Sequence, residues 1–214
     1  MNSTAMAPID WYFDFISPFA YLQWQRLQRQ APVRLISPKP ILFAGLLKHW
    51  DNKGPVEIAP KRDWTYAHCL WIAHHHGIAM TLPSQHPFNP LPLLRLCIAL
   101  DCQPAVIDRL FDYVWRDGCV PTDTAAWMAL LQELRIDAAA LDDPAIKAQL
   151  KSNGDQAIAA GVFGVPTAVV DGHNFWGVDA TDMLHAFVQG DPFFSSAEFQ
   201  RIASLPSGMQ RKLG

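Results

Sequence analysis

The sequence has no C-x-x-C pair, so it lacks the dithiol motif on which disulfide oxidoreductases depend. Its four cysteines are scattered, and two of them lie in strongly apolar helical patterns. Since no export signal accompanies them, we expect free and buried thiols rather than disulfides. The four are Cys69, Cys97, Cys102 and Cys119.

Long apolar runs and blocks of basic residues are also missing. No apolar stretch approaches the length of a membrane span, so we expect no membrane partner. The formal net charge is −3 and the Lys and Arg residues are dispersed, which argues against a nucleic-acid partner. The first residues, MNSTAMAPIDWYF, lack the basic start and apolar core of a signal peptide, and we therefore expect a cytoplasmic protein.

A metal-binding pattern is absent as well. The triplet His74–His76 is conspicuous, but adjacent histidines on a helix point in different directions. His68 would share a helix face with His75, yet the two are too far apart along the helix to bind one ion. No E-x-x-H or C-x-x-C spacing supports them, so we predict no metal site.

The chain does have a large apolar content and clear periodicities. Half of its 214 residues are hydrophobic, which is ample for a real core. A strand pattern at 9–15 is followed by a helix pattern at 18–30 and a second strand at 33–37, which together predict a compact β-α-β unit. A short helix at 41–49 then leads to a polar loop at 51–62.

The middle of the chain is helical in every strong pattern, from residue 61 to residue 161. Apolar residues recur at helix spacing in 104–118, which a proline opens, and again in 124–136. Asp123 or Thr124 is a suitable N-cap for the second of these helices.

The last part of the chain returns to strands. A hairpin with an Asp-Gly turn and a closing helix are predicted at 167–170, 174–176 and 179–188. The order is therefore β-α-β, about five helices, then β-β-α. We predict an α/β fold in which a helical insertion domain, residues 61–161, splits a domain made of residues 8–60 and 162–214. A cleft is expected between them at Ser17 and Val165.

Ser17-Pro18 stands where the first strand gives way to the first helix. Serine at the N-cap followed by proline is a preferred helix start, so capping is the ordinary interpretation. A helix N-terminus also presents free N–H groups and the positive end of a dipole, which favour an anion. A bound thiolate would suit this place, because helix N-termini lower thiol pKa values. The two roles are compatible.

Val165-Pro166 and Asp179 are the next candidates. A proline just before a strand is most often an ordinary trans residue at its edge. If the bond is cis, the backbone of Val165 can pair with an extended, peptide-like ligand. Asp179 at the start of the closing helix is either another N-cap or a carboxylate that holds a ligand's ammonium group.

The polar loop and one histidine complete the set. Asn52, Lys61 and Arg62 are by default solvated, but they could supply a hydrogen bond and positive charge to a carboxylate. His86, in the segment HPFNP, is either structural or part of a cleft wall.

Four segments taken together resemble a known family. YFDFISPFAYL, NKGPVEIAPKR, HPFNPLPLLRL and GVFGVPTAVVDG followed by FWGVDA are similar, in this order, to segments of the 2-hydroxychromene-2-carboxylate isomerases. These enzymes belong with the kappa-class glutathione transferases and, more distantly, with DsbA-like thioredoxin-fold proteins. The resemblance spans about residues 9–190. It implies a thioredoxin-like fold interrupted by an all-helical domain, with glutathione bound between the two parts, and a homodimer.

The resemblance also implies roles for individual residues. Ser17 would point its hydroxyl at the glutathione sulfur, Val165 with a cis Pro166 would pair with the cysteinyl backbone, and Asp179 would hold the γ-glutamyl end. The family often has Arg or Ser after that aspartate, whereas this chain has Ala180, for which Thr181 is a candidate substitute.

The remaining implied contacts concern the substrate, an aromatic carboxylate. Asn52, Lys61, Arg62 and His86 would lie near it.

Three functions stay open from the sequence. The first is a glutathione-dependent isomerase, in which a thiolate adds to an activated double bond, the bond rotates, and glutathione leaves unconsumed. The second is a kappa-type glutathione transferase or peroxidase, which consumes glutathione. The third is a non-catalytic binding module of thioredoxin fold. A disulfide oxidoreductase is disfavoured because the first helix begins Ser17-Pro18-Phe19-Ala20, without a thiol.

Overall fold

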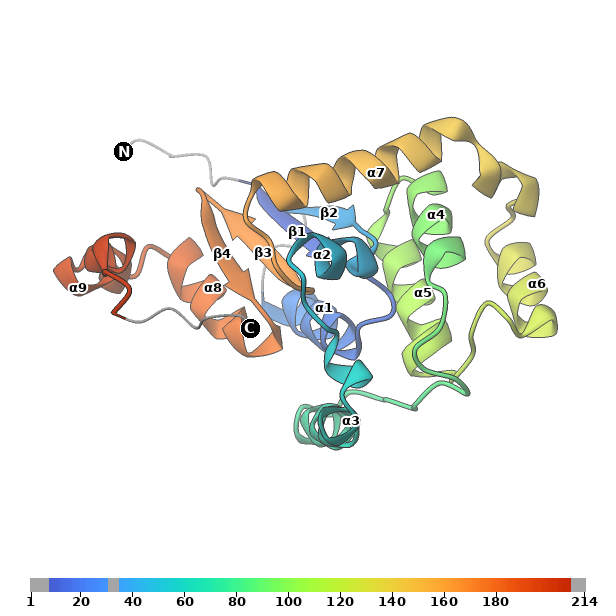
Figure 1. Ribbon diagram of the computed structural model, residues 1–214. Helices are drawn as coiled ribbons and strands as arrows, with labels where there is room; N and C mark the ends of the chain where they lie inside the picture. The colour runs from blue at the N-terminus through green and yellow to red at the C-terminus, as the bar shows by residue number, and fades with distance from the viewer. Residues whose placement is uncertain (1–7, 31–34, 209–214) are drawn as a thin grey trace.

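The computed structural model describes residues 8–30 and 35–208, and its centre is a four-stranded sheet (Figure 1). The strands lie in the order β2-β1-β3-β4. β1 pairs parallel with β2 and antiparallel with β3, and β3 and β4 form a hairpin. Their bounds are β1 Ile9–Phe13, β2 Ile36–Pro40, β3 Thr167–Val170 and β4 His173–Trp176.

The second strand differs from its predicted position. Residues 33 and 34 of the prediction lie outside the described residues, and β2 continues past Ser37 to Pro40. Pro38 and Pro40 interrupt its sequence pattern, which is why the pattern predicted an end at Ser37. They are accommodated because β2 is an edge strand, where a missing backbone N–H leaves no neighbouring strand unpaired.

The helices fall close to where periodicity predicts them. Residues 61–161, all of which are described, contain helices and turns but no strand. The Asp123 carboxylate accepts the Ala126 N–H at 3.2 Å, which confirms the predicted cap. The longer helices are α1 Pro18–Gln30, α2 Phe43–His49, α3 Ala59–His75, α4 Leu91–Ala99, α5 Pro104–Trp115, α6 Thr124–Glu133, α7 Pro144–Ala159 and α8 Thr181–Val188, and a short α9 spans Ala197–Arg201.

Several boundaries differ from the prediction. The first strand ends at Phe13 and not at residue 15. The loop 51–62 ends earlier than expected, because α3 begins at Ala59 with a proline in its first turn, so Lys61 and Arg62 lie on a helix. The closing helix begins at Thr181 rather than Asp179, which sits in a preceding 3₁₀ turn. A tighter 3₁₀ turn is a common entry to an α-helix and has no separate sequence signature.

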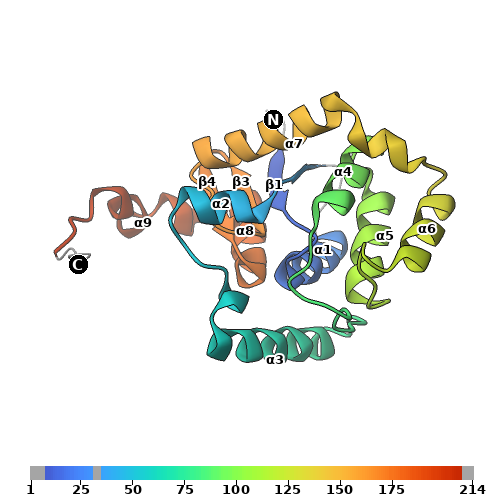
Figure 2. The ribbon, with the colours of Figure 1, turned by 45° about the vertical axis from the view of Figure 1, so that its right-hand side comes forward.

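The sheet is covered on both faces (Figures 1 and 2). α2 and α7 lie on one side and α1 and α8 on the other, while α4, α5 and α6 gather beyond the β2 edge. The alternation of β1 follows this arrangement, because successive side chains of a strand point to opposite faces. Trp11 and Phe13 join the main hydrophobic core, whereas Tyr12 packs in a second cluster with Leu46 and Ala157.

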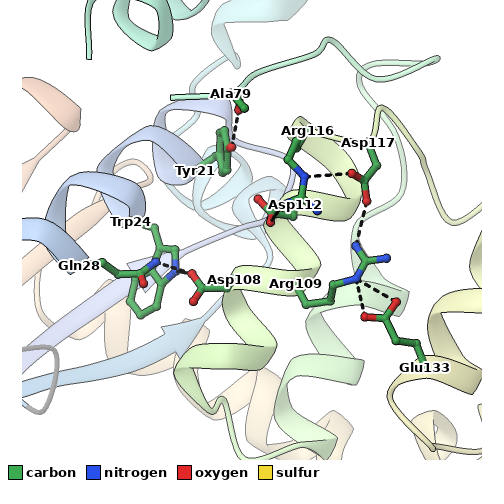
Figure 3. A network of polar contacts seen from close by, with 10 residues as sticks. All are labelled: Tyr21, Trp24, Gln28, Ala79, Asp108, Arg109, Asp112, Arg116, Asp117 and Glu133. Atoms are coloured by element: carbon green, nitrogen blue, oxygen red, sulfur yellow. Dashed lines mark hydrogen bonds and ion pairs between the residues drawn. The ribbon is translucent and has the colours of Figure 1, made fainter. Parts of the chain in front are cut away.

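A polar network anchors α1 to α5 (Figure 3). The indole N–H of the fully buried Trp24 donates to the Asp108 carboxylate at 2.6 Å, and the Gln28 amide donates to the same group. Tyr21 donates to the Ala79 carbonyl at 2.5 Å. These contacts position α1, which Ser17 precedes as its N-cap.

The predicted division into two domains stays a prediction, as does the homodimer. Buried residues of α1 and of α5 belong to one continuous hydrophobic cluster, so the helical segment packs closely on the α/β part. All four cysteines are free; Cys69 and Cys97 are buried, but Cys102 and Cys119 only partly. Within the described residues, none of the helices has the length and apolar content needed to cross a membrane.

Candidate functional site

A cavity of about 810 Å³ opens at the N-terminus of α1. Its walls come from three regions: the start of α1, the 52–57 segment with α3, and the residues around β3 and β4. Six residues singled out from the sequence line it, namely Ser17, Asn52, Lys61, His86, Val165 and Asp179. Arg62, Pro166, Ala180 and Thr181 do not. The predicted cleft at Ser17 and Val165 is thus present.

Ser17 is a helix cap and part of the cavity wall at once. Its Oγ accepts the Ala20 N–H at 3.2 Å, the expected capping bond. The same hydroxyl donates to the Val165 carbonyl at 3.4 Å, a long contact that leaves the hydroxyl able to turn toward a better acceptor. Only 7% of the residue is exposed, so such an acceptor would be largely shielded from water.

Two backbone donors beside Ser17 are unpaired. Within residues 8–30 and 35–208, no hydrogen-bond partner accompanies the N–H of Phe19, in the first turn of α1, or the N–H of Val165. The first suits an anion, because it is an open donor at a helix N-terminus. The second, next to the carbonyl of the same residue, can pair with an extended backbone.

The peptide bond between Val165 and Pro166 is cis, as anticipated for a ligand-facing proline. A second cis bond joins His86 to Pro87 and was not foreseen from the sequence. Both His86 and Pro87 line the cavity.

The turn after β4 contains the candidates Asp179, Ala180 and Thr181, and of these only Asp179 lines the cavity. Asp179 is exposed there. Thr181 is buried, and its hydroxyl donates to the Val178 carbonyl at 2.5 Å, so it does not take the place of a ligand-binding side chain at position 180. The turn is held from α1, since Gln23 donates to the Gly177 carbonyl at 2.8 Å and Arg26 to that of Val178 at 2.9 Å.

Two lysines line the cavity from the 52–57 segment and α3. Lys53 and Lys61 both line the cavity, although only the second was predicted. The Asn52 side chain accepts the N–H of Lys53 at 2.8 Å, which leaves its amide N–H₂ for other contacts. Arg62 does not line the cavity; its side chain donates to the Val56 carbonyl at 2.9 Å and so holds the 52–57 segment against α3.

Much of the remaining wall is apolar and aromatic. An elongated ligand with a flat ring and one or two charged groups would match these surfaces. The apolar lining includes Phe19, Leu42, Phe43, Leu47, Trp64 and Phe88.

The sequence profile of the DsbA-like thioredoxin domain matches residues 8–189. This chain belongs to the DsbA-like thioredoxin family. It is 30% identical over 193 residues to 2-hydroxychromene-2-carboxylate isomerase of Sphingobium xenophagum, covering 84% of this chain and 97% of the relative. It is 28% identical over 184 residues to glutathione S-transferase kappa 2 of Caenorhabditis elegans, with 77% and 82% covered. A solved 2-hydroxychromene-2-carboxylate isomerase shares the fold, with a TM-score of 0.72, 24% identity, and 89% and 98% of the chains covered.

This member of the DsbA-like family buries an acid that the sequence analysis missed. Asp14 is fully buried beside Ser17, and its two carboxylate oxygens accept the N–H groups of Ile16 at 3.1 Å and Phe43 at 2.9 Å. Burial raises the pKa of Asp14 to about 7, although these two bonds oppose the shift. The only sequence signal was an aspartate within an otherwise apolar strand end.

A second residue missed by the sequence analysis is Tyr66, which contacts His86 but does not itself line the cavity. The Tyr66 hydroxyl is 2.7 Å from His86 Nδ1, and His86 Nε2 is 2.8 Å from the Ile16 carbonyl oxygen. Burial lowers the pKa of His86, so the ring is favoured in its neutral form. Nothing in the local pattern of α3 distinguishes Tyr66 from its other aromatic residues.

Proposed function

We propose that this chain is a glutathione-dependent isomerase that interconverts 2-hydroxychromene-2-carboxylates and trans-o-hydroxybenzylidenepyruvates. The observation that carries the proposal is the placement of the Ser17 hydroxyl and the unpaired Phe19 N–H at the N-terminus of α1, in a cavity that Val165 also lines. A serine here binds a thiolate without forming a disulfide to it, which favours addition chemistry over disulfide exchange. Relatives named as isomerases, such as that of Sphingobium xenophagum, support the substrate class.

The residues present fit glutathione. Ser17 Oγ–H and the Phe19 N–H would face its sulfur, the N–H and C=O of Val165 would pair with its cysteinyl backbone, and Asp179 would bind its ammonium group. When bound, glutathione would supply a thiolate nucleophile that adds reversibly to the activated double bond. The chain's task is to favour the ionised sulfur at neutral pH and to shield it from water.

The substrate would occupy the rest of the cavity. Lys53 and Lys61 would attract its carboxylate, and Asn52 would donate a hydrogen bond. The aromatic wall of Phe43, Trp64 and its neighbours would hold the ring.

A kappa-type glutathione transferase is the alternative function. It is favoured by the similarity to the Caenorhabditis elegans transferase.

Measuring isomerisation together with the concentration of free thiol distinguishes the isomerase from the transferase. A chromene carboxylate is followed by its ultraviolet absorbance while glutathione is titrated and free thiol is measured in parallel. We expect the rate to saturate with glutathione and the total thiol to stay unchanged. Stoichiometric loss of thiol with an electrophile, and no isomerisation, would replace the proposal by the transferase.

Asp179 provides a test of the orientation of glutathione. Asp179→Asn removes the charge that would bind the ammonium group and should weaken glutathione binding by about 1.5 kcal/mol, the low end for a charged hydrogen bond because the residue is exposed. Isothermal titration calorimetry measures the change. Asp171→Asn removes the same charge from the β3–β4 turn, outside the cavity, and should leave affinity unaltered. Equal affinities for the parent and Asp179→Asn would place the γ-glutamyl group elsewhere.

A further inference from the structure

The peptide unit that precedes Ser17 is held from both sides. Its carbonyl oxygen, on Ile16, lies 2.8 Å from His86 Nε2. Its N–H, on Ser17, donates to the Asp14 carbonyl oxygen at 3.1 Å. One residue earlier, the Phe15 carbonyl accepts the indole N–H of Trp115 at 2.9 Å. The turn into α1 is therefore fixed by one local backbone bond and by two side chains, those of His86 and Trp115, that come from distant parts of the chain.

The hydrogen bonds assign the protonation of His86. A carbonyl oxygen can only accept, so Nε2 of His86 must carry the hydrogen that points to Ile16. In a neutral imidazole the other nitrogen is then an acceptor. The Tyr66 hydroxyl donates to Nδ1 at 2.7 Å in preference to its alternative acceptor, the His86 carbonyl oxygen at 3.4 Å. Tyr66 thus selects the tautomer that can hold the Ile16 carbonyl.

His86 has no ring nitrogen left for a ligand. It lines the cavity, but Nε2 and Nδ1 are both committed to partners within the protein. A role as a general base or as a direct polar ligand of the substrate would require one of these bonds to break.

We propose that His86 is a positioning residue that sets the direction of the Ser17 hydroxyl, with Tyr66 fixing its tautomer. The inference rests on the proposed function in that Ser17 is taken as the thiolate site. Rotation of the Ile16–Ser17 peptide would turn both Ser17 Oγ and the first N–H groups of α1 away from a bound sulfur. A site of this kind tolerates displacements of only about 0.5 Å.

Three substitutions separate this role from a purely structural one. Tyr66→Phe removes the donor to Nδ1 and frees the other tautomer, whose Nε2 lone pair would oppose the Ile16 carbonyl. His86→Asn shortens the side chain so that it no longer reaches that carbonyl. His86→Gln places an amide N–H where Nε2–H was and should restore the contact. Tyr113→Phe is the matched control, because it deletes a buried tyrosine hydroxyl, bonded to Val120 at 2.8 Å, outside the cavity.

The main measurement is the pKa of bound glutathione, from thiolate absorbance against pH at saturating glutathione, together with kcat and KM for isomerisation. Tyr66→Phe and His86→Asn should each raise this pKa by up to about one unit and lower kcat about two- to tenfold, with little change in KM, as expected for one lost hydrogen bond. His86→Gln should recover most of both losses, and Tyr113→Phe should change neither.

A measurement without glutathione tests the His86 tautomer separately from the proposed function. Nitrogen-15 NMR of the free protein should find the His86 hydrogen on Nε2, and Tyr66→Phe should redistribute it toward Nδ1. A hydrogen on Nδ1 in the parent overturns the proposal. Unchanged thiolate titration in folded Tyr66→Phe and His86→Asn overturns it too, as does a His86→Gln variant no better than His86→Asn. If the parent binds no glutathione but the tautomer is as expected, the proposed function fails, while the bond by which His86 holds the Ile16 carbonyl stands.

Discussion

Ser17→Ala should raise the pKa of enzyme-bound glutathione by roughly one to two units. The hydroxyl would give the thiolate one charge-assisted hydrogen bond, worth about 1.5–3 kcal/mol, and each pKa unit corresponds to about 1.36 kcal/mol. The end of α1 and the Phe19 N–H remain in the variant, so part of the lowering of the thiol pKa should persist. Thiolate absorbance against pH, at saturating glutathione, measures the shift.

The control for this experiment is a second serine cap. Ser17→Ala also removes the bond from the Ala20 N–H, which costs about 1 kcal/mol of stability. Ser196 caps α9 in the same way, accepting the Phe199 N–H at 3.2 Å, and does not line the cavity. Ser196→Ala should lose similar stability without changing the thiol pKa. If folded Ser17→Ala titrates like the parent, Ser17 is a cap and has no part in thiolate binding.

Between about pH 4 and pH 7, Asp14 should lower the free energy of unfolding by about 4 kcal/mol. The pKa of Asp14 is raised from 3.8 to about 7 by burial, a difference of about three units at 1.36 kcal/mol each. In this interval the folded protein keeps a proton on Asp14 that the unfolded chain releases. Rising pH therefore favours unfolding until the folded carboxyl itself ionises near pH 7, above which the contribution is constant.

Chemical denaturation of the parent and of Asp14→Asn at several pH values isolates this contribution. The variant has nothing to titrate at position 14, so its stability relative to the parent should improve by about 4 kcal/mol from pH 4 to pH 7.5. At low pH the variant should be the weaker of the two, because one amide oxygen cannot accept both the Ile16 and Phe43 N–H groups. Asp10→Asn, which changes an accessible carboxylate on β1, the strand that precedes Asp14, controls for the loss of charge. A stability difference that stays constant with pH would mean that Asp14 is ionised throughout.

Local chemistry determined the elements of this protein and several features of its site. The caps at Ser17 and Asp123 join residues three apart, so a short window of sequence contains the whole interaction. The Asp171-Gly172 turn is equally local, with both residues at positive φ, as a tight hairpin requires. Periodicity located the helices, because the spacing of apolar residues within each segment shows which face the helix buries.

Contacts between residues far apart in the sequence were decided by the tertiary structure alone. His86 reaches Ile16 across 70 positions and Tyr66 is 20 positions from His86, so no window of sequence contains their contact. Thr181 was a plausible ligand by residue type, but it is buried and its hydroxyl donates to the Val178 carbonyl. The raised pKa of Asp14 depends on desolvation by every element packed around it. Burial of that kind is a property of the assembled sheet and helices and of no single segment.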